Sequence, residues 1–153
     1  EDNIAQLLAA WRHAERPVIH VRHMSRSPDS VFWPGQPGAE FQPRFSPTAT
    51  EHVVEKNVTD AFAQTGLERW LHARNINALV IVGVSTNYSV EATTRSAGCL
   101  GFSTCVVSDA CFTFDKTDIT GQLRQADDLH IVSLTNLAGE YASVVSTKEL
   151  LSP

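Results

Sequence analysis

A continuous apolar run, Ala78 to Val84 (ALVIVGV), constrains the fold of this 153-residue chain more than any other segment. Strands with one wet face alternate apolar and polar residues. A strand that is apolar at every position is typical of a parallel sheet with helices on both faces. The run is far too short to span a bilayer. We therefore expect a buried parallel strand within an α/β protein.

The rest of the chain alternates between helix and strand patterns. Glu1-Asp2-Asn3 fits a helix cap, and the following apolar stripe has helical spacing. Thr65 to Glu68 fits a capping box. The predicted helices carry Ile4 to Trp11, Trp70 and Leu71, Asn87 to Leu100, Ile119 to Ala126, and Leu137 to Val145. The other predicted strands are Val18 to Val21, His52 to Lys56, Ser103 to Val107, and His130 to Leu134, with a turn region from Ser108 to Lys116.

This alternation predicts a three-layer α/β/α sandwich with a mostly parallel, Rossmann-like sheet. The length suits one domain over residues 1–153. The segment from Met24 to His52 carries five prolines, and irregular segments this long are usually lids, binding loops or disordered. Its aromatic residues favour a packed loop; they are Phe32, Trp33, Phe41 and Phe45.

Composition excludes several classes of function. The net charge of −5 argues against nucleic-acid binding, and no cluster of Lys and Arg suits an anionic membrane. No signal peptide opens the sequence, and three cysteines cannot all pair, so we expect a cytoplasmic protein. Cys99 and Cys105 resemble small buried hydrophobes, and we favour a packing role for Cys111. His20 and His23 would point to opposite faces of a strand, so we expect no metal and no cofactor.

Ligands in open α/β sheets bind beyond the carboxyl ends of the strands. That rule selects Lys56 and the turn Ser85 to Ser89 as candidates. Ser89 falls in the first turn of a helix, where free N–H groups favour an anion. A cysteine there would be a good nucleophile, whereas a serine needs a positioned base. On spacing alone, an ordinary helix-start serine and a solvated strand-end lysine fit equally well.

With these residues in place, nearly the whole chain resembles the isochorismatase-like cysteine hydrolase superfamily. The nucleophile segment, ALVIVGVSTNYSVEATTRSA, is the most specific part of the resemblance. The segments RPVIHVRHMS, FWPGQPGAEFQP, EKNVTDAFAQTGLERWL and VVSDACFTFD support it by their order and spacing.

The resemblance implies a role for several residues. The family's nucleophile, a cysteine before Val-Glu-x-Thr, falls on Ser89, and the catalytic lysine falls on Lys56. A non-proline cis peptide would lie between Val84 and Ser85, and the N–H groups of Ser85 and Ser89 would form the oxyanion hole. The candidate substrate-binding residues are Tyr88, Phe32, Trp33, Phe62 and His23.

Two departures from the family pattern matter. The family's third catalytic residue is an aspartate at the end of the first strand, and the sequence starts after that point. We therefore expect the first, central strand to be missing through truncation. The second departure is serine for cysteine at position 89. An engineered inactive variant is the first explanation and a naturally degenerate homologue the second.

The resemblance implies a small-molecule amide or ureide hydrolase that works through a cysteine thioester, impaired here by Ser89. One alternative is isochorismatase-type cleavage of an enol ether, where acid–base work matters more than a thiol. Another is a catalytically silent binding or assembly homologue. The Asp-x-His…His metal motif of nicotinamidases is not seen. The family also implies a homodimer or larger homo-oligomer.

Overall fold

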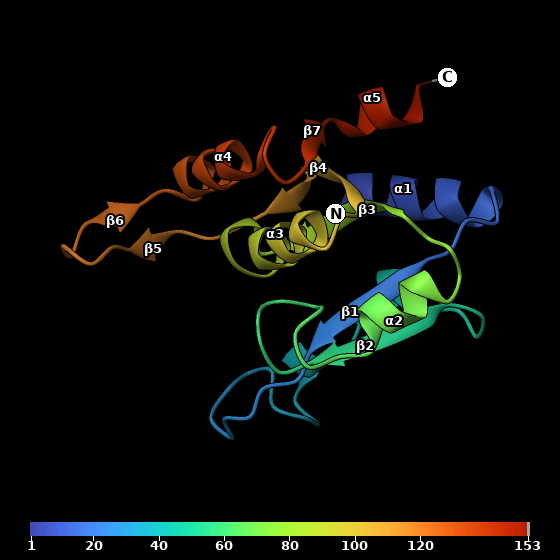
Figure 1. The fold of residues 1–153 in the computed structure, drawn as a ribbon. Helices are drawn as coiled ribbons and strands as arrows, with labels where there is room; N and C mark the ends of the chain where they lie inside the picture. Colours follow the sequence, from blue (N-terminus) through green and yellow to red (C-terminus); the bar gives the residue numbers. More distant parts are fainter. Residues whose placement is uncertain (153) are drawn as a thin grey trace.

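The computed structural model describes residues 1–152 and confirms an α/β fold built on parallel strands (Figure 1). The helices are α1 (Asp2–His13), α2 (Leu67–His72), α3 (Glu91–Cys99), α4 (Ala126–Leu137) and α5 (Thr147–Leu151). Short turns of helix are η1 (Pro37–Ala39), η2 (Pro43–Phe45) and the π-helical η3 (Thr86–Val90). The strands are β1 (Ile19–His23), β2 (His52–Lys56), β3 (Ala78–Val84), β4 (Ser103–Phe112), β5 (Lys116–Thr117), β6 (Leu123–Arg124) and β7 (Ser143–Val145).

The parallel strands form two groups. One group pairs β1 with β2, and the other has the order β3-β4-β7. Within residues 1–152 no ladder joins β1 to β3, so β3 is paired along one edge only. Val80 and Val84 are more than one-third exposed for this reason. The expectation that the whole run 78–84 is buried is therefore wrong for the described part of the chain.

Helices cover both faces of the group β3-β4-β7, which confirms the layered arrangement. Val106 and Val107 follow one another in β4, point to opposite faces and are fully buried. Val106 packs in a cluster with Leu134 and Leu137 of α4. Val107 packs with Leu7 of α1, beside the apolar end of α5. A third cluster joins β2 to α2 and α3; it contains Val54, Ala61, Leu67, Leu71, Ala97 and Phe102.

The last third of the chain differs most from the sequence-based expectation. Residues 119–125 form no helix: β5 and β6 make an antiparallel hairpin, and its turn is closed by Asp118. The Asp118 carboxylate accepts hydrogen bonds from the Thr120 and Gln122 amides and from Arg124 Nε. Gly121 lies in the left-handed region at φ 84°, which glycine adopts without strain. Local side-chain bonds therefore override the apparent helical spacing.

The elements that follow are shifted along the chain. The predicted strand His130 to Leu134 lies inside α4, because Ser133, Leu134 and Leu137 are buried with helical spacing while Ile131 and Val132 are exposed. The predicted last helix is replaced by β7 and α5. Strand β4 also continues through Phe112, where a turn from Ser108 was expected.

Two predicted caps and one predicted buried thiol are also wrong. No side chain caps α1: its N-cap residue is Glu1, and Asn3, inside the helix, donates from Nδ2 to the Asp109 carbonyl at 2.7 Å. At α2, Thr65 Oγ1 accepts from the Leu67 amide, so Thr65 and Glu68 form no capping box. Cys99 is exposed, because it lies at the outer end of α3.

The long segment before β2 is organised by η1 and η2. Phe41 packs edge-on against the His20 ring, with 5.7 Å between ring centroids, as a packed loop requires. Phe32, in contrast, is exposed. No helix among residues 1–152 has the length and apolar character needed to cross a bilayer.

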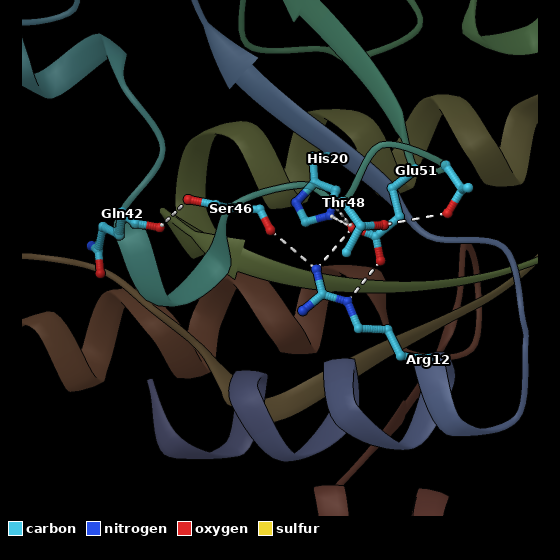
Figure 2. Close-up of polar contacts among 7 residues, drawn as sticks. Arg12, His20, Gln42, Ser46, Thr48 and Glu51 are labelled. Carbon is cyan, nitrogen blue, oxygen red and sulfur yellow. Dashed lines mark hydrogen bonds and ion pairs between the residues drawn. The ribbon is translucent and has the colours of Figure 1, made fainter.

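A buried acid joins α1 to the start of β2 (Figure 2). The Glu51 carboxylate accepts from Arg12 Nε and Nη2, at 2.7 and 2.8 Å, and lies 2.9 Å from His20 Nε2. It also accepts from the Thr48 amide at 2.8 Å. These donors, Arg12 first, lower the pKa of Glu51 to about 2. Because α1 packs on β4, this network connects the two groups of strands.

We expect Glu51→Gln to lower the free energy of unfolding by ~1.5–3 kcal/mol at pH 7, because a charged hydrogen-bond acceptor is lost. The folded-state pKa of Glu51 is depressed, so its stabilisation is present above pH 4.5 and disappears as the pH falls towards 2. The difference between wild type and variant should therefore shrink across that window. Urea denaturation at a series of pH values measures it.

The matched control is Glu55→Gln, which removes the exposed partner of Arg22. Exposed ion pairs contribute about 0–1 kcal/mol. Equal losses from the two substitutions would contradict the assignment of Glu51 as the stabilising group.

Candidate functional site

Lys56 is the buried centre of the candidate site. It ends β2, and only 4% of its surface is exposed. Its Nζ atom lies 2.9 Å from Ser89 Oγ, and it also hydrogen-bonds to the Thr59 carbonyl oxygen. The structure therefore brings together two residues that lie 33 positions apart in the sequence. The contact spans the two groups of strands, because Ser89 follows β3.

Burial changes the protonation of Lys56. Loss of solvation lowers its pKa to about 8, and the charge of Asp60 opposes that shift. The pKa of His23 is also lowered, first by burial and then by the positive charge of Lys56. His23 pairs with Lys56 in the β1–β2 ladder, so both residues end their strands at the same edge.

Ser89 lies in the tight turn that follows β3. The Val84–Ser85 peptide bond is cis, and η3 begins at the next residue. The amides of Tyr88 and Val90 both donate to the Ser85 carbonyl at 3.2 Å. Within residues 1–152 the Ser85 N–H donates to no acceptor, and Ser89 is partly exposed. A carbonyl oxygen placed at this helix start would meet N–H groups and the positive end of the helix dipole.

Polar side chains from later elements hold this turn in place. Thr86 is fully buried, and its Oγ1 lies 2.8 Å from Nδ1 of His130 in α4. The Thr113 hydroxyl donates to Asn87 Oδ1 at 2.5 Å. Sequence reasoning missed both partners. The sequence predicts a strand at His130, which lies in α4. Nothing in the sequence pairs Thr113 with Asn87.

A third contact reaches the turn from the hairpin. Lys116 Nζ hydrogen-bonds to the Tyr88 hydroxyl and lies 4.7 Å from the Tyr88 ring centroid. Tyr88 itself is exposed beside Ser89. The sequence predicts only a turn region from Ser108 to Lys116 and gives no sign of this contact.

The other predicted substrate-binding residues separate into two groups. His23 and Phe32 pack edge to face, with 5.8 Å between ring centroids, so Phe32 lies next to the Lys56 edge. Phe62 instead stacks on Phe102 at 5.7 Å and packs against the hydrophobic core. Trp33 belongs to a turn of the long segment, and its amide donates to the Ser30 carbonyl.

The nearby carboxylate of Asp60 bonds to other groups, and the nearby thiol of Cys111 is buried. Asp60 accepts from Ser96 Oγ at 2.6 Å and from the Phe62 amide at 2.8 Å. No carboxylate of residues 1–152 hydrogen-bonds to Lys56 or Ser89. Burial raises the pKa of the Cys111 thiol to about 12, so this thiol is not a ready nucleophile. No group of three or more His, Cys, Asp or Glu in the described chain is arranged to hold a metal ion.

A separate hollow of about 530 Å³ lies between β2 and α2. Its lining includes His52, Trp70 and Arg74 but neither Lys56 nor Ser89. The His52 and Trp70 rings stack at 4.3 Å, and the Arg74 guanidinium covers the Trp70 ring at 4.1 Å. These contacts account for the residues as surface packing away from the candidate site.

Comparison of the sequence and the fold with known proteins identifies the family. The Isochorismatase domain model matches residues 2–149. The uncharacterized isochorismatase family protein YrdC of Bacillus subtilis is 34% identical over 99% of this chain and 81% of its own length. Maleamate amidohydrolase of Pseudomonas putida is 27% identical over 98% of this chain and 72% of its own length. The crystal structure of an isochorismatase-family hydrolase from Chromobacterium violaceum superposes with a TM-score of 0.94 at 49% identity, covering 98% of this chain and 78% of that one. This chain is therefore a member of the isochorismatase family of hydrolases.

Proposed function

We propose that this protein is a small-molecule hydrolase whose site is built for C–N cleavage of an amide or ureide, with residue 89 in the position that receives the acyl group. The observation that carries this proposal is the 2.9 Å contact between Lys56 Nζ and Ser89 Oγ at the start of η3. The similarity to an amidohydrolase supports this substrate class.

The roles of the residues follow from chemistry. A thiolate at position 89 would attack the carbonyl carbon, and the charge of Lys56 would stabilise that thiolate. The N–H groups of Ser85 and Ser89 would donate to the developing oxyanion. Ammonia or an amine would leave, and water would cleave the thioester. The family resemblance assigns the proton transfer to an aspartate, and no carboxylate of residues 1–152 hydrogen-bonds to Ser89.

Ser89 weakens this chemistry without changing the shape of the site. A hydroxyl ionises far above neutral pH, and a serine therefore needs a base where a thiol needs little help. Amides are demanding substrates, because the amine must be protonated to leave. We propose that the protein with Ser89 is impaired as an amidohydrolase.

Two other functions fit the same site. Enol-ether cleavage of the isochorismatase type depends on proton transfer, so serine at position 89 would be less damaging. A silent binding homologue would hold a ligand at the Phe32 and Tyr88 side of the site without turning it over. We rank both below amide hydrolysis.

We also propose that the protein forms a homo-oligomer through the hairpin arm. The arm, residues 114–124, projects away from the layers, and β5 and β6 pair only with each other (Figure 1). Ile119 is fully exposed, and Phe114 and Leu123 are mostly exposed. An isolated two-stranded hairpin is marginally stable, so an arm of this kind needs a partner surface.

A second copy of the chain supplies that surface. Ile131 and Val132 on the outer face of α4 are exposed, and a two-fold contact would place each arm against the α4 of the other copy. Lys116 of the arm, which contacts Tyr88, and the acidic first turn of α4, Asp127 and Asp128, carry opposite charges that suit such a contact.

The location is proposed from the cysteines. All three thiols are free, and a reducing compartment such as the cytoplasm suits them.

We expect Ser89→Cys to raise the release of ammonia or amine by at least ~100-fold, because the thiol ionises readily where the hydroxyl does not. The measurement is steady-state turnover by the full-length protein on a panel of primary amides, N-substituted amides and ureides that includes maleamate. Ser89→Ala is the matched control and should be inactive on every compound.

Equal activity of the Ser89 and Ser89→Cys proteins on an enol ether would favour the second function. Ligand binding without turnover by either protein would favour the silent homologue. Either result would displace amide hydrolysis as the proposed function.

We expect the full-length protein to have twice its monomer mass in sedimentation equilibrium, and the double variant Ile119→Asp/Leu123→Asp to have the monomer mass. Buried carboxylates without partners would disrupt the proposed contact. Val31→Asp is the control, since Val31 is similarly exposed but lies in the loop after β1. A monomeric wild type, or an arm variant that remains a dimer, would show that the arm is not the interface.

A further inference from the structure

Helix α4 holds the turn that carries Ser89 at two points. At the start of the turn, Thr86 Oγ1 lies 2.8 Å from Nδ1 of His130, which is half-buried in α4. At its end, Val90 packs in one buried cluster with Leu137 of the same helix. Residue 89 lies between these two contacts, so its position depends on the position of α4.

The contact at Thr86 is the more demanding of the two, because a hydrogen bond requires a defined distance and angle. Thr86 is fully buried, and a buried hydroxyl without a partner costs free energy. Its branched side chain has few rotamers, so the hydrogen bond also restrains the backbone of the turn. His130 is itself held in place, since the Asp115 carboxylate accepts from the Ala126 amide at 2.8 Å and anchors the first turn of α4.

The backbone next to Thr86 carries a donor that the proposed chemistry needs. The Ser85 N–H directly precedes Thr86 and donates to no acceptor among residues 1–152. The proposed function assigns this group, with the N–H of residue 89, to the developing oxyanion. Oxyanion donors act only when they point at the place where charge develops. A misplacement of about 1 Å in such a site can slow a reaction by ~100-fold.

We infer that His130 is a positioning residue for the oxyanion donors, and that it acts through the hydroxyl of Thr86. This inference rests on the acyl-transfer site of the proposed function and adds a residue that lies 44 positions from Thr86 in the sequence. His130 holds Thr86, Thr86 holds the Ser85 N–H, and that N–H meets the substrate oxygen. Either atom of the hydrogen bond can be the donor, because a hydroxyl both donates and accepts.

Two reactions at position 89 separate this role from a general effect on the fold. In acetylation by p-nitrophenyl acetate, a thiolate bonds to the carbonyl carbon, negative charge develops on the carbonyl oxygen, and p-nitrophenolate leaves. In alkylation by iodoacetamide, the same thiolate bonds to the methylene carbon and displaces iodide, so no oxyanion forms. The test therefore uses the Ser89→Cys protein with Cys99→Ser, which removes the exposed thiol. Peptide mass mapping locates each product.

We expect Thr86→Val in that protein to slow acetylation by at least ~10-fold and to leave alkylation within about twofold, because only the oxyanion donors are misplaced. His130→Phe should have the same selective effect. Thr86→Ser and His130→Asn keep a hydrogen-bonding group at each position and should keep most of the acetylation rate. The double variant Thr86→Val/His130→Phe should be no slower than either single variant, since both remove the same contact.

Thr135→Val is the matched control. It makes the same substitution on the exposed side of α4, where the Thr135 hydroxyl donates to the Ile131 carbonyl at 2.8 Å. Both rates should be unchanged in this variant. Circular dichroism checks that each variant is folded. If Thr86→Val is not, His130→Phe and its comparison with His130→Asn provide the same measurement at a half-buried residue.

Three results would overturn the inference. The first is an unchanged acetylation rate in Thr86→Val and His130→Phe, or no acetylation of the parent protein. The second is an equal loss of acetylation and alkylation, which would indicate a structural role alone. The third is a double variant much slower than either single variant, which would show that the two residues act separately.

Amide turnover by Ser89→Cys is measured separately from these rates. Selective loss of acetylation without amide turnover would remove amide hydrolysis as the function and leave the role of His130. Amide turnover without the selective loss would remove only the role of His130.

Discussion

The hydrogen bond between Lys56 and Ser89 joins the two groups of parallel strands at their carboxyl ends. Lys56 ends β2, Ser89 follows β3, and within residues 1–152 no ladder connects those groups. At the opposite ends of the strands, Arg12 of α1 and Glu51 before β2 make the corresponding connection. The position of the candidate site therefore depends on polar side chains, which require defined geometry, more than on a continuous sheet.

These two connections differ in electrostatic character. Glu51 is surrounded by donors, so its charged form is favoured and its pKa falls to about 2. Lys56 is buried with a carbonyl and a hydroxyl as its hydrogen-bond partners, and its pKa falls because its charged form is disfavoured. A carboxylate held in its charged form and an amine whose charged form is disfavoured thus lie in one fold. The difference comes from the partners that each buried residue meets.

Sequence alone predicted the layers and the strands around the site, because β3 is a continuous apolar run and α1 has an apolar stripe with helical spacing. It also selected Lys56 and Ser89, since strand ends in α/β sheets are ligand sites. It was wrong from Ile119 to Val145, where helical spacing of Ile119, Leu123 and Ala126 competes with the side-chain bonds of Asp118. The contacts of Thr86 and Asn87 were not predictable, because their partners His130 and Thr113 are distant in sequence.

The identity of residue 89 has a different meaning once the position of Lys56 is known. Considered as a replaced cysteine, a serine is a weak nucleophile without a base. Beside Lys56, whose Nζ donates to Ser89 Oγ at 2.9 Å, the same hydroxyl oxygen is a hydrogen-bond acceptor. Because Lys56 is buried, the packing around the end of β2 sets the pKa of the amine that contacts residue 89.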